Sequence, residues 1–95
     1  MGKGKKRITW RIMYKVVITP KAKRELKSIK SLYKRAIILA IDELQEDPML
    51  GKPLKRELHN KYSYRVGFYR IIYTINKKDK KVFILTAGHR SIIYK

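Results

Sequence analysis

The stretch Tyr64-Arg65-Val66-Gly67-Phe68-Tyr69-Arg70-Ile71-Ile72-Tyr73 decides the fold of this chain. Two runs rich in β-branched and aromatic residues meet at Gly67-Phe68, a pattern that predicts two antiparallel strands joined by a tight turn. With the turn at this point, Arg65 lies directly opposite Arg70. Like charges that face each other across a sheet are destabilising, so this pairing indicates an anionic ligand that offsets the repulsion.

Alternation of apolar and polar residues predicts strands at about 62–67, 68–76 and 81–88. If residues 77–81 form the loop between the last two, one face of the sheet is apolar and ready to accept helices. On that face Ile71 meets Ala87, Tyr73 meets Leu85 and Ile75 meets Phe83, and on the other Arg70, Ile72 and Thr74 meet Gly88, Thr86 and Ile84. Arg90 follows Gly88 along the strand, so the guanidinium groups of Arg65, Arg70 and Arg90 are expected to converge at one end of the sheet.

The preceding sequence predicts a strand and a helical hairpin. Residues 14–18 form a short strand, after which Thr19 is a good N-cap and Pro20 suits the first helical position. Helices are expected at about 20–30 and 31–46, and Asp47-Pro48 ends the second. Its apolar stripe consists of Leu32, Tyr33, Ala36, Ile37, Ala40, Ile41 and Leu44. Residues 49–60 are expected to form a loop with a short edge strand near 54–58.

The fold class is therefore α+β: an N-terminal strand, a helical hairpin, and then a mainly antiparallel sheet of three to four strands. A chain of 95 residues favours one domain, which we place at 13–95. Residues 1–12 are expected to be a basic, flexible extension.

The charge of the chain indicates a polyanionic partner. Twenty-five Lys and Arg against seven Asp and Glu give a formal net charge of +18, and such a surface attracts phosphates over a distance. Residues 36–50 carry no basic side chain and four acidic ones, so this stretch is expected to turn away from the polyanion. An acidic protein that covers the basic face is a second explanation, compatible with the first.

Several classes of protein are disfavoured. The absence of cysteine excludes disulfides and cysteine metal sites. No apolar run has the length of a membrane span and no secretory signal begins the chain, so a cytoplasmic location is expected. A helix-turn-helix protein is also disfavoured, because the joint at Lys30-Ser31 lacks the usual glycine.

Clustered arginines suit the cleavage of RNA by its own 2′-hydroxyl, because guanidinium groups stabilise the charge that develops on the phosphate. A conventional acid–base pair is not evident. His89 falls on the apolar face, His59 lies in a loop, and Glu57 is either a base or a solvated surface group. Tyr94 either stacks on a base and contacts the 2′-hydroxyl or packs the C-terminus. Arg65 and Arg70 have the alternative of extending into solvent or pairing with Glu57 or Asp79.

The 64–73 stretch, followed by Thr86-Ala87-Gly88-His89-Arg90 and Tyr94, resembles the signature of RelE toxins of the RelE/ParE superfamily. The start of the chain from Tyr14 is similar as well. The resemblance implies ribosome-dependent endoribonuclease activity on messenger RNA, without metal or cofactor, and neutralisation by a RelB-type antitoxin. It implies that Arg70 and Arg90 stabilise the transition state and that Tyr94 orients the 2′-hydroxyl. Arg65 matches the second of two family lysines.

The first family lysine is replaced by Ser63, which leaves Arg65 or Lys61 as the substitute proton donor. We therefore expect Arg65, Arg70, Arg90 and Tyr94 to be catalytic, and Lys55, Arg56, Lys61 and Ser63 to contact RNA. Two alternatives remain. A ParE-like toxin would poison DNA gyrase without catalysis, and a nonspecific nucleic-acid-binding protein would need only the charge.

Overall fold

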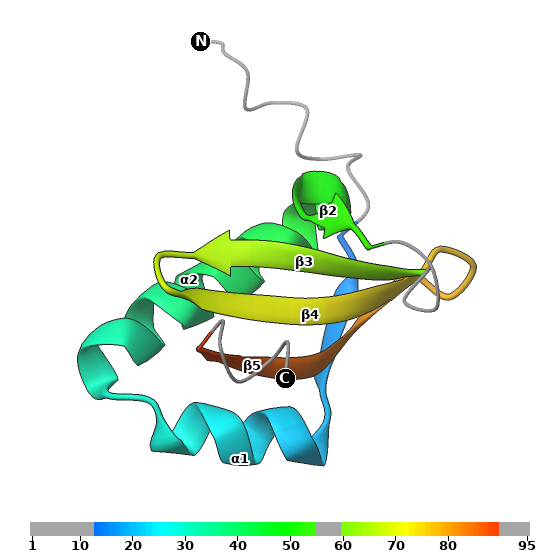
Figure 1. Cartoon of the computed structure of the whole chain (residues 1–95). Helices are drawn as coiled ribbons and strands as arrows, with labels where there is room; N and C mark the ends of the chain where they lie inside the picture. The colour runs from blue at the N-terminus through cyan, green and yellow to red at the C-terminus, as the bar shows by residue number, and fades with distance from the viewer. Residues whose placement is uncertain (1–12, 55–59, 90–95) are drawn as a thin grey trace, which may run out of the picture.

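The structure is a computed structural model that describes residues 13–54 and 60–89. Its strands form a five-stranded sheet in the order β1-β5-β4-β3-β2, packed against two helices (Figure 1). In chain order the elements are β1 (Lys15–Ile18), α1 (Pro20–Ser28), α2 (Ser31–Glu46), the 3-10 helix η2 (Pro48–Leu50), β2 (Lys52–Pro53), β3 (Lys61–Val66), β4 (Tyr69–Asn76) and β5 (Lys81–His89). Only β1 and β5 pair in parallel, so the expected α+β class with a mainly antiparallel sheet is confirmed.

The helix boundaries follow the capping residues that the sequence predicts. The hydroxyl of Thr19 accepts a hydrogen bond from the Ala22 N–H at 3.2 Å, and Pro20 occupies the first position of α1. α2 ends at Asp47, directly before Pro48. The edge strand β2 precedes the expected position near 54–58, of which residues 55–58 lie outside the described ranges.

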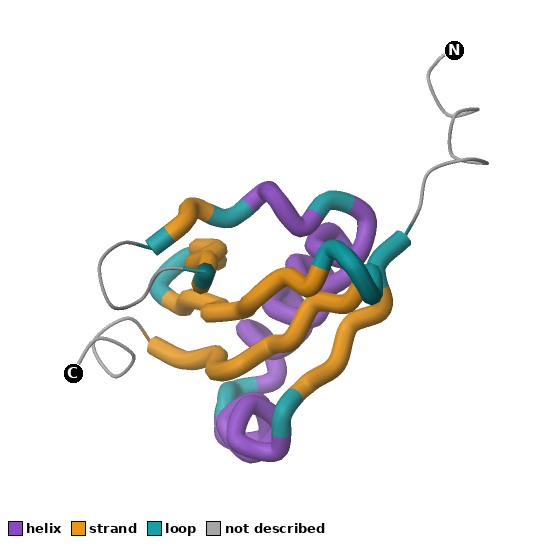
Figure 2. The backbone as a smooth tube through the Cα atoms, turned by 90° about the vertical axis from the view of Figure 1, so that its right-hand side faces the viewer, coloured by secondary structure: helices purple, strands orange, loops and turns teal. Residues whose placement is uncertain are grey.

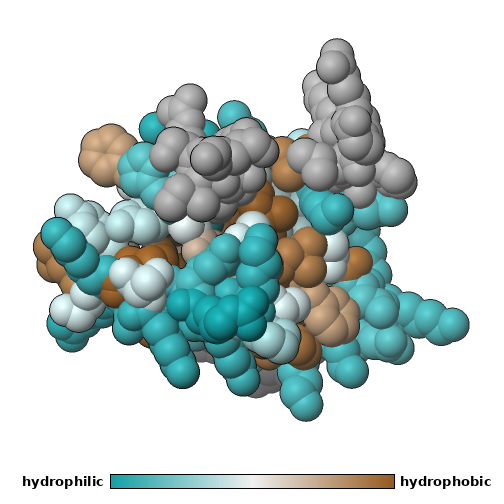
Figure 3. Space-filling model, turned by 60° about the horizontal axis from the view of Figure 1, so that its bottom comes forward, coloured by the Kyte–Doolittle hydropathy of each residue, from teal (hydrophilic) through white to brown (hydrophobic). Residues whose placement is uncertain are grey.

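The core lies between the helices and one face of the sheet. From α2 it receives Ile37, Ala40, Ile41 and Leu44, all buried, and from the sheet Ile71, Tyr73, Val82, Ile84 and Ala87. In Figure 2, α1 is seen nearly end-on beneath the strands. The side of α1 that points away from the core faces solvent. The molecular surface in Figure 3 is mainly hydrophilic, with apolar side chains between the polar ones.

The prediction that an apolar stripe of α2 packs on the sheet is wrong for the first turns of the helix. Leu32 is 75% exposed, Tyr33 is 42% exposed and Ala36 is also exposed. The beginning of α2 extends past the strands in Figure 1. In this region the ring of Tyr33 lies 5.4 Å from the ring of Tyr69, which belongs to the sheet. The helical pattern of apolar residues in α2 is therefore longer than the part of the helix that packs on the sheet.

The predicted pairing of β4 with β5 is right at one end and wrong at the other. Ile71 lies opposite Ala87, Ile72 opposite Thr86 and Arg70 opposite Gly88, as expected. The register then shifts between Ile72 and Tyr73, so the remaining pairs are Tyr73 with Ile84, Thr74 with Phe83 and Ile75 with Val82. Leu85 is the extra residue of a β-bulge, which moves Ile84 and Val82 into the core in place of Leu85 and Phe83.

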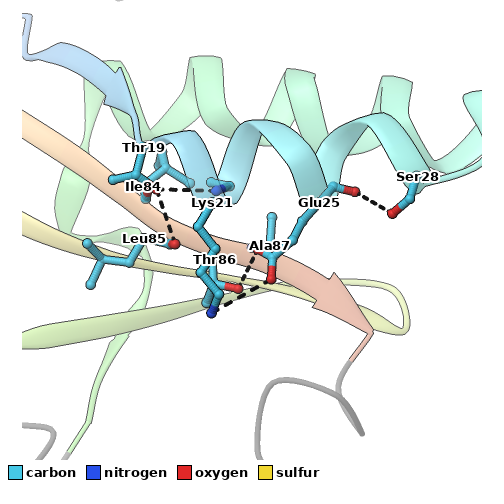
Figure 4. A network of polar contacts seen from close by, with 9 residues as sticks. Thr19, Lys21, Glu25, Ser28, Ile84, Leu85, Thr86 and Ala87 are labelled. Atoms are coloured by element: carbon cyan, nitrogen blue, oxygen red, sulfur yellow. Dashed lines mark hydrogen bonds and ion pairs between the residues drawn. The ribbon is translucent and has the colours of Figure 1, made fainter.

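The start of α1 holds this bulge (Figure 4). The Thr19 hydroxyl lies 2.8 Å from the Ile84 carbonyl oxygen and 3.2 Å from that of Leu85, so one donor serves both. Six residues later, a Glu25 carboxylate oxygen accepts hydrogen bonds from the Thr86 hydroxyl at 2.6 Å and from the Ala87 N–H at 3.0 Å. Because β1 ends opposite Ile84, Glu25 satisfies the β5 edge that β1 leaves unpaired.

Candidate functional site

The β3–β4 hairpin places two arginines side by side, as the sequence predicts. Arg65 pairs directly with Arg70, and Val66 pairs with Tyr69. Gly67 in the turn has a φ of 62°, a left-handed conformation that glycine adopts without steric cost. Tyr64, Val66 and Ile71 pack toward the helices. The alternating Arg65 and Arg70 therefore lie on the opposite face of the sheet, which neither α1 nor α2 covers.

The two arginines are held differently. Arg70 is half-buried, and its Nη1 lies 3.4 Å from the hydroxyl of Ser63, which is itself only 5% exposed. Arg65 is exposed, and its Nε donates to the Gly67 carbonyl oxygen at 3.4 Å. Arg70 is thus the more fixed of the two cations.

Asp79, one of the alternative partners for the arginines, belongs to the other end of the sheet. It accepts a hydrogen bond from the Asn76 amide nitrogen and donates its own N–H to Asn76 Oδ1. Asn76 lies six residues along β4 from Arg70, roughly 20 Å away in an extended strand. Glu57, the other alternative, lies outside the described residues.

A pocket of about 260 Å³ opens beside the arginines. Among the described residues its lining consists of Leu50, Lys52, Ser63, Tyr64, Arg65 and Arg70, so this part of the lining has three cations, one buried hydroxyl and no carboxylate. Lys52 reaches this face because it pairs directly with Ser63. The sequence analysis missed Lys52, since nothing in a two-residue edge strand fixes its partner in advance.

A buried tyrosine fixes the segment that carries Lys52. The Tyr73 hydroxyl donates to the Pro48 carbonyl oxygen at 2.6 Å and accepts from the Gly51 N–H at 2.9 Å. Burial raises the pKa of Tyr73 to about 12. Gly51 lies so close that a Cβ atom built on it would be 2.5 Å from this hydroxyl. The core therefore determines where β2 begins.

The other expected site residues are distributed as follows. Lys61 lies on the same face at the start of β3, opposite Thr74, and does not line the pocket. His89 pairs with Tyr69, on the helix-facing side as expected, but it is exposed, with its ring 5.9 Å from that of Tyr69. Lys55, Arg56, His59, Arg90 and Tyr94 lie outside the described residues.

The acidic stretch forms a separate surface on the helix side of the sheet edge. Asp42, Glu43, Glu46 and Asp47 line a pocket of about 510 Å³ with Leu39, Leu50 and Tyr64. The Tyr64 hydroxyl donates to Glu43 Oε1 at 2.9 Å, and this hydrogen bond is the main reason that the pKa of Tyr64 is raised. The negative charge is thus concentrated on α2 and its C-cap Asp47, and none of these four side chains is among the described residues that line the arginine pocket.

Residues 13–54 and 60–89 contain no cluster of three or more His, Asp or Glu side chains suited to a metal ion. No helix in the same ranges combines the length and the apolar character needed to span a membrane.

Comparisons with known proteins agree with the fold. Residues 16–94 match the family of ParE toxins of the type II toxin–antitoxin system parDE. Toxin RelG of Mycobacterium tuberculosis is 37% identical over 84 residues, which cover 86% of this chain and 97% of that protein.

Solved structures give the same result. The toxin–antitoxin complex RelBE2 of Mycobacterium tuberculosis contains a chain with a TM-score of 0.78 and 36% identity, covering 83% of this chain and 100% of the other. The archaeal RelE–RelB complex of Pyrococcus horikoshii gives a TM-score of 0.68 and 28% identity, covering 82% and 96%. This chain belongs to the ParE toxin family of type II toxin–antitoxin systems, within the RelE/ParE superfamily and close to its RelE-type members.

Proposed function

We propose that this toxin is a ribosome-dependent endoribonuclease that cleaves messenger RNA without a metal ion. The observation that carries the proposal is the direct opposition of Arg65 and Arg70 beside a pocket that both arginines line together with Lys52 and Ser63. An arrangement of this kind costs stability in the free protein, and a bound phosphate offsets that cost.

In the proposed reaction the 2′-hydroxyl loses its proton and its oxygen attacks the neighbouring phosphorus. The bond to the 5′-oxygen breaks, this oxygen takes up a proton and leaves as a 5′-hydroxyl, and a 2′,3′-cyclic phosphate forms. Arg70, positioned by Ser63, stabilises the charge on the non-bridging oxygens, and Arg65 adds a second guanidinium group. Arg90 and Tyr94 are assigned to charge stabilisation and to orientation of the 2′-hydroxyl by family resemblance alone. Lys55, Arg56, Lys61 and Ser63 are proposed to contact the RNA, and residues 13–95 to form the toxin domain.

The proposal also includes a RelB-like antitoxin. Relatives of this fold have been solved as RelB–RelE complexes, and α2 exposes apolar side chains that favour a protein partner, among them Leu32 and Leu39, 75% and 60% exposed. A net charge of +18 favours an acidic partner segment. The ribosome and messenger RNA as targets place the activity in the cytoplasm.

The second candidate is a non-catalytic toxin that poisons DNA gyrase. The family match to ParE toxins favours this alternative. A protein that only binds gyrase has no need for a pocket that positions arginines, and for this reason we prefer the nuclease.

Primer extension on a translated messenger RNA, with and without ribosomes, separates the two candidates. The nuclease produces cuts at codon-defined positions only when ribosomes are present, and Arg70→Ala and Arg90→Ala each reduce the cleavage rate by about 100-fold or more. Arg24→Ala, on the exposed side of α1, serves as the control and leaves cleavage unchanged. Intact RNA together with inhibited supercoiling by gyrase would replace our proposal with the alternative.

A further inference from the structure

Lys52 is a cation of the pocket that family resemblance does not assign. It lies on the edge strand β2, directly opposite Ser63, and directly opposed residues present their side chains on the same face. Ser63 in turn contacts Arg70. Lys52 and Arg70 thus approach the pocket from opposite sides of β3, two strand spacings or roughly 10 Å apart across the sheet, within reach of two long side chains.

The position of Lys52 is built into the fold, although its side chain is exposed. The preceding residue, Gly51, donates its N–H to the buried Tyr73 hydroxyl and has no room for a side chain. On the other side, the Leu54 N–H donates to the Lys61 carbonyl oxygen at 2.8 Å. The backbone is therefore fixed both before and after Lys52.

We propose that Lys52 belongs to the same phosphate-binding pocket and contacts the same RNA phosphate as Arg65 and Arg70. This inference rests on the proposed function and extends it by one binding residue. The pocket has a volume of about 260 Å³, and its described lining residues include no acidic side chain, so it suits a single phosphate with its sugar better than a stacked base. Lysine contributes a compact charge with three rotatable donors beside the two planar guanidinium groups.

The test uses a short, fully 2′-O-methylated single-stranded RNA, which the full-length toxin binds but cannot cut. Lys52→Gln is expected to weaken binding about tenfold at low salt, as the loss of a charge-assisted contact does. The slope of log K against log salt is expected to fall in magnitude by about 0.7, the value for one phosphate contact on a single strand. Lys52→Arg should retain most of the affinity.

Lys23→Gln is the matched control, because Lys23 is also exposed but lies on α1. It removes the same charge and is expected to leave the salt slope unchanged. An equal change for Lys52→Gln and Lys23→Gln would overturn the inference, since it would reduce Lys52 to one part of a diffuse positive surface. Thermal unfolding of both variants verifies that they are folded.

The cleavage assay separates this inference from the proposed function. If the wild-type toxin cuts translated RNA and Lys52→Gln cuts it equally well, the assignment of Lys52 fails alone. If the wild-type toxin cuts no RNA, the proposed function fails, and the binding measurement still decides whether Lys52 contacts a phosphate.

Discussion

Arg65 and Arg70 lie directly opposite each other on β3 and β4, one exposed and one half-buried. The half-buried side chain has a hydroxyl partner in Ser63, whereas the exposed one donates to a nearby backbone group, the Gly67 carbonyl oxygen. Replacement of Arg65 therefore relieves the repulsion at the smallest cost in other contacts.

The first prediction concerns this repulsion. Arg65→Gln is expected to raise the free energy of unfolding by about 0.2–1 kcal/mol at low ionic strength, because the opposed charge is removed while the strand is kept. The same change should lower RNA cleavage. Urea unfolding is the appropriate measurement, since guanidinium chloride would screen the effect.

Added sulfate provides the control for the first prediction. It should stabilise the wild-type protein more than Arg65→Gln, because the divalent anion occupies the pocket between the arginines. Arg24→Gln on α1 should show neither effect. A loss of stability in Arg65→Gln at low salt would mean that the pairing of Arg65 with Arg70 does not destabilise the free protein.

The second prediction concerns the Tyr73 hydroxyl. Tyr73→Phe leaves the Gly51 N–H and the Pro48 carbonyl without their partner in a buried site, and is expected to cost about 1–3 kcal/mol of unfolding free energy. Because η2 and β2 are released together, RNA binding should weaken as it does for Lys52→Gln. Phe is nearly isosteric with Tyr, so a stability unchanged within 0.5 kcal/mol or so would contradict this role.

The third prediction follows from the pKa of Tyr73, which burial raises from 10.0 to about 12. The unfolded chain ionises this tyrosine at lower pH than the folded one does. The stabilisation is therefore fully present below pH 10 and is lost as the pH rises to 12, by about 2–3 kcal/mol. The measurement is the difference in unfolding free energy between wild type and Tyr73→Phe across this range.

Comparison with Tyr73→Phe removes the contribution of the other tyrosines and the lysines, which titrate similarly in both proteins. The difference between the two should be constant from pH 7 to pH 9 and should shrink only above pH 10. A difference that stays constant up to pH 12 would show that Tyr73 ionises equally in the folded and unfolded states.

Local signals predicted the helices and the arginine hairpin well. Thr19-Pro20 and Asp47-Pro48 mark the ends of helices through effects that act within a few residues. Gly67 defines a turn of minimal length, and a turn of known length fixes the register of Arg65 against Arg70.

Contacts that depend on distant residues could not be predicted. The bulge at Leu85 is held by Thr19, more than sixty positions earlier in the chain, and no alternation within β5 indicates it. The pairing of Lys52 with Ser63 depends on where Tyr73 anchors Gly51. In both cases one side chain from another element sets the register, and sequence spacing carries no information about such a contact.

The fourth prediction concerns the free edge of β5. Glu25 accepts hydrogen bonds from the Thr86 hydroxyl and the Ala87 N–H beyond the end of β1. Glu25→Ala removes both and is expected to cost about 2–3 kcal/mol, because the acceptor is charged and partly buried. Exchange of the Ala87 amide hydrogen should accelerate relative to that of Ile84, whose segment of β5 is still paired with β1.

A double-mutant cycle with Thr86→Val isolates the side-chain contact. If Glu25 acts through Thr86, the two substitutions together should cost less than the sum of the single ones, with a coupling of about 0.5–3 kcal/mol. Gly88, one residue beyond Ala87, lies opposite Arg70, so loosening this edge should also lower RNA cleavage. Strict additivity, with Ala87 exchange unchanged in Glu25→Ala, would show that the end of β5 is held by other contacts.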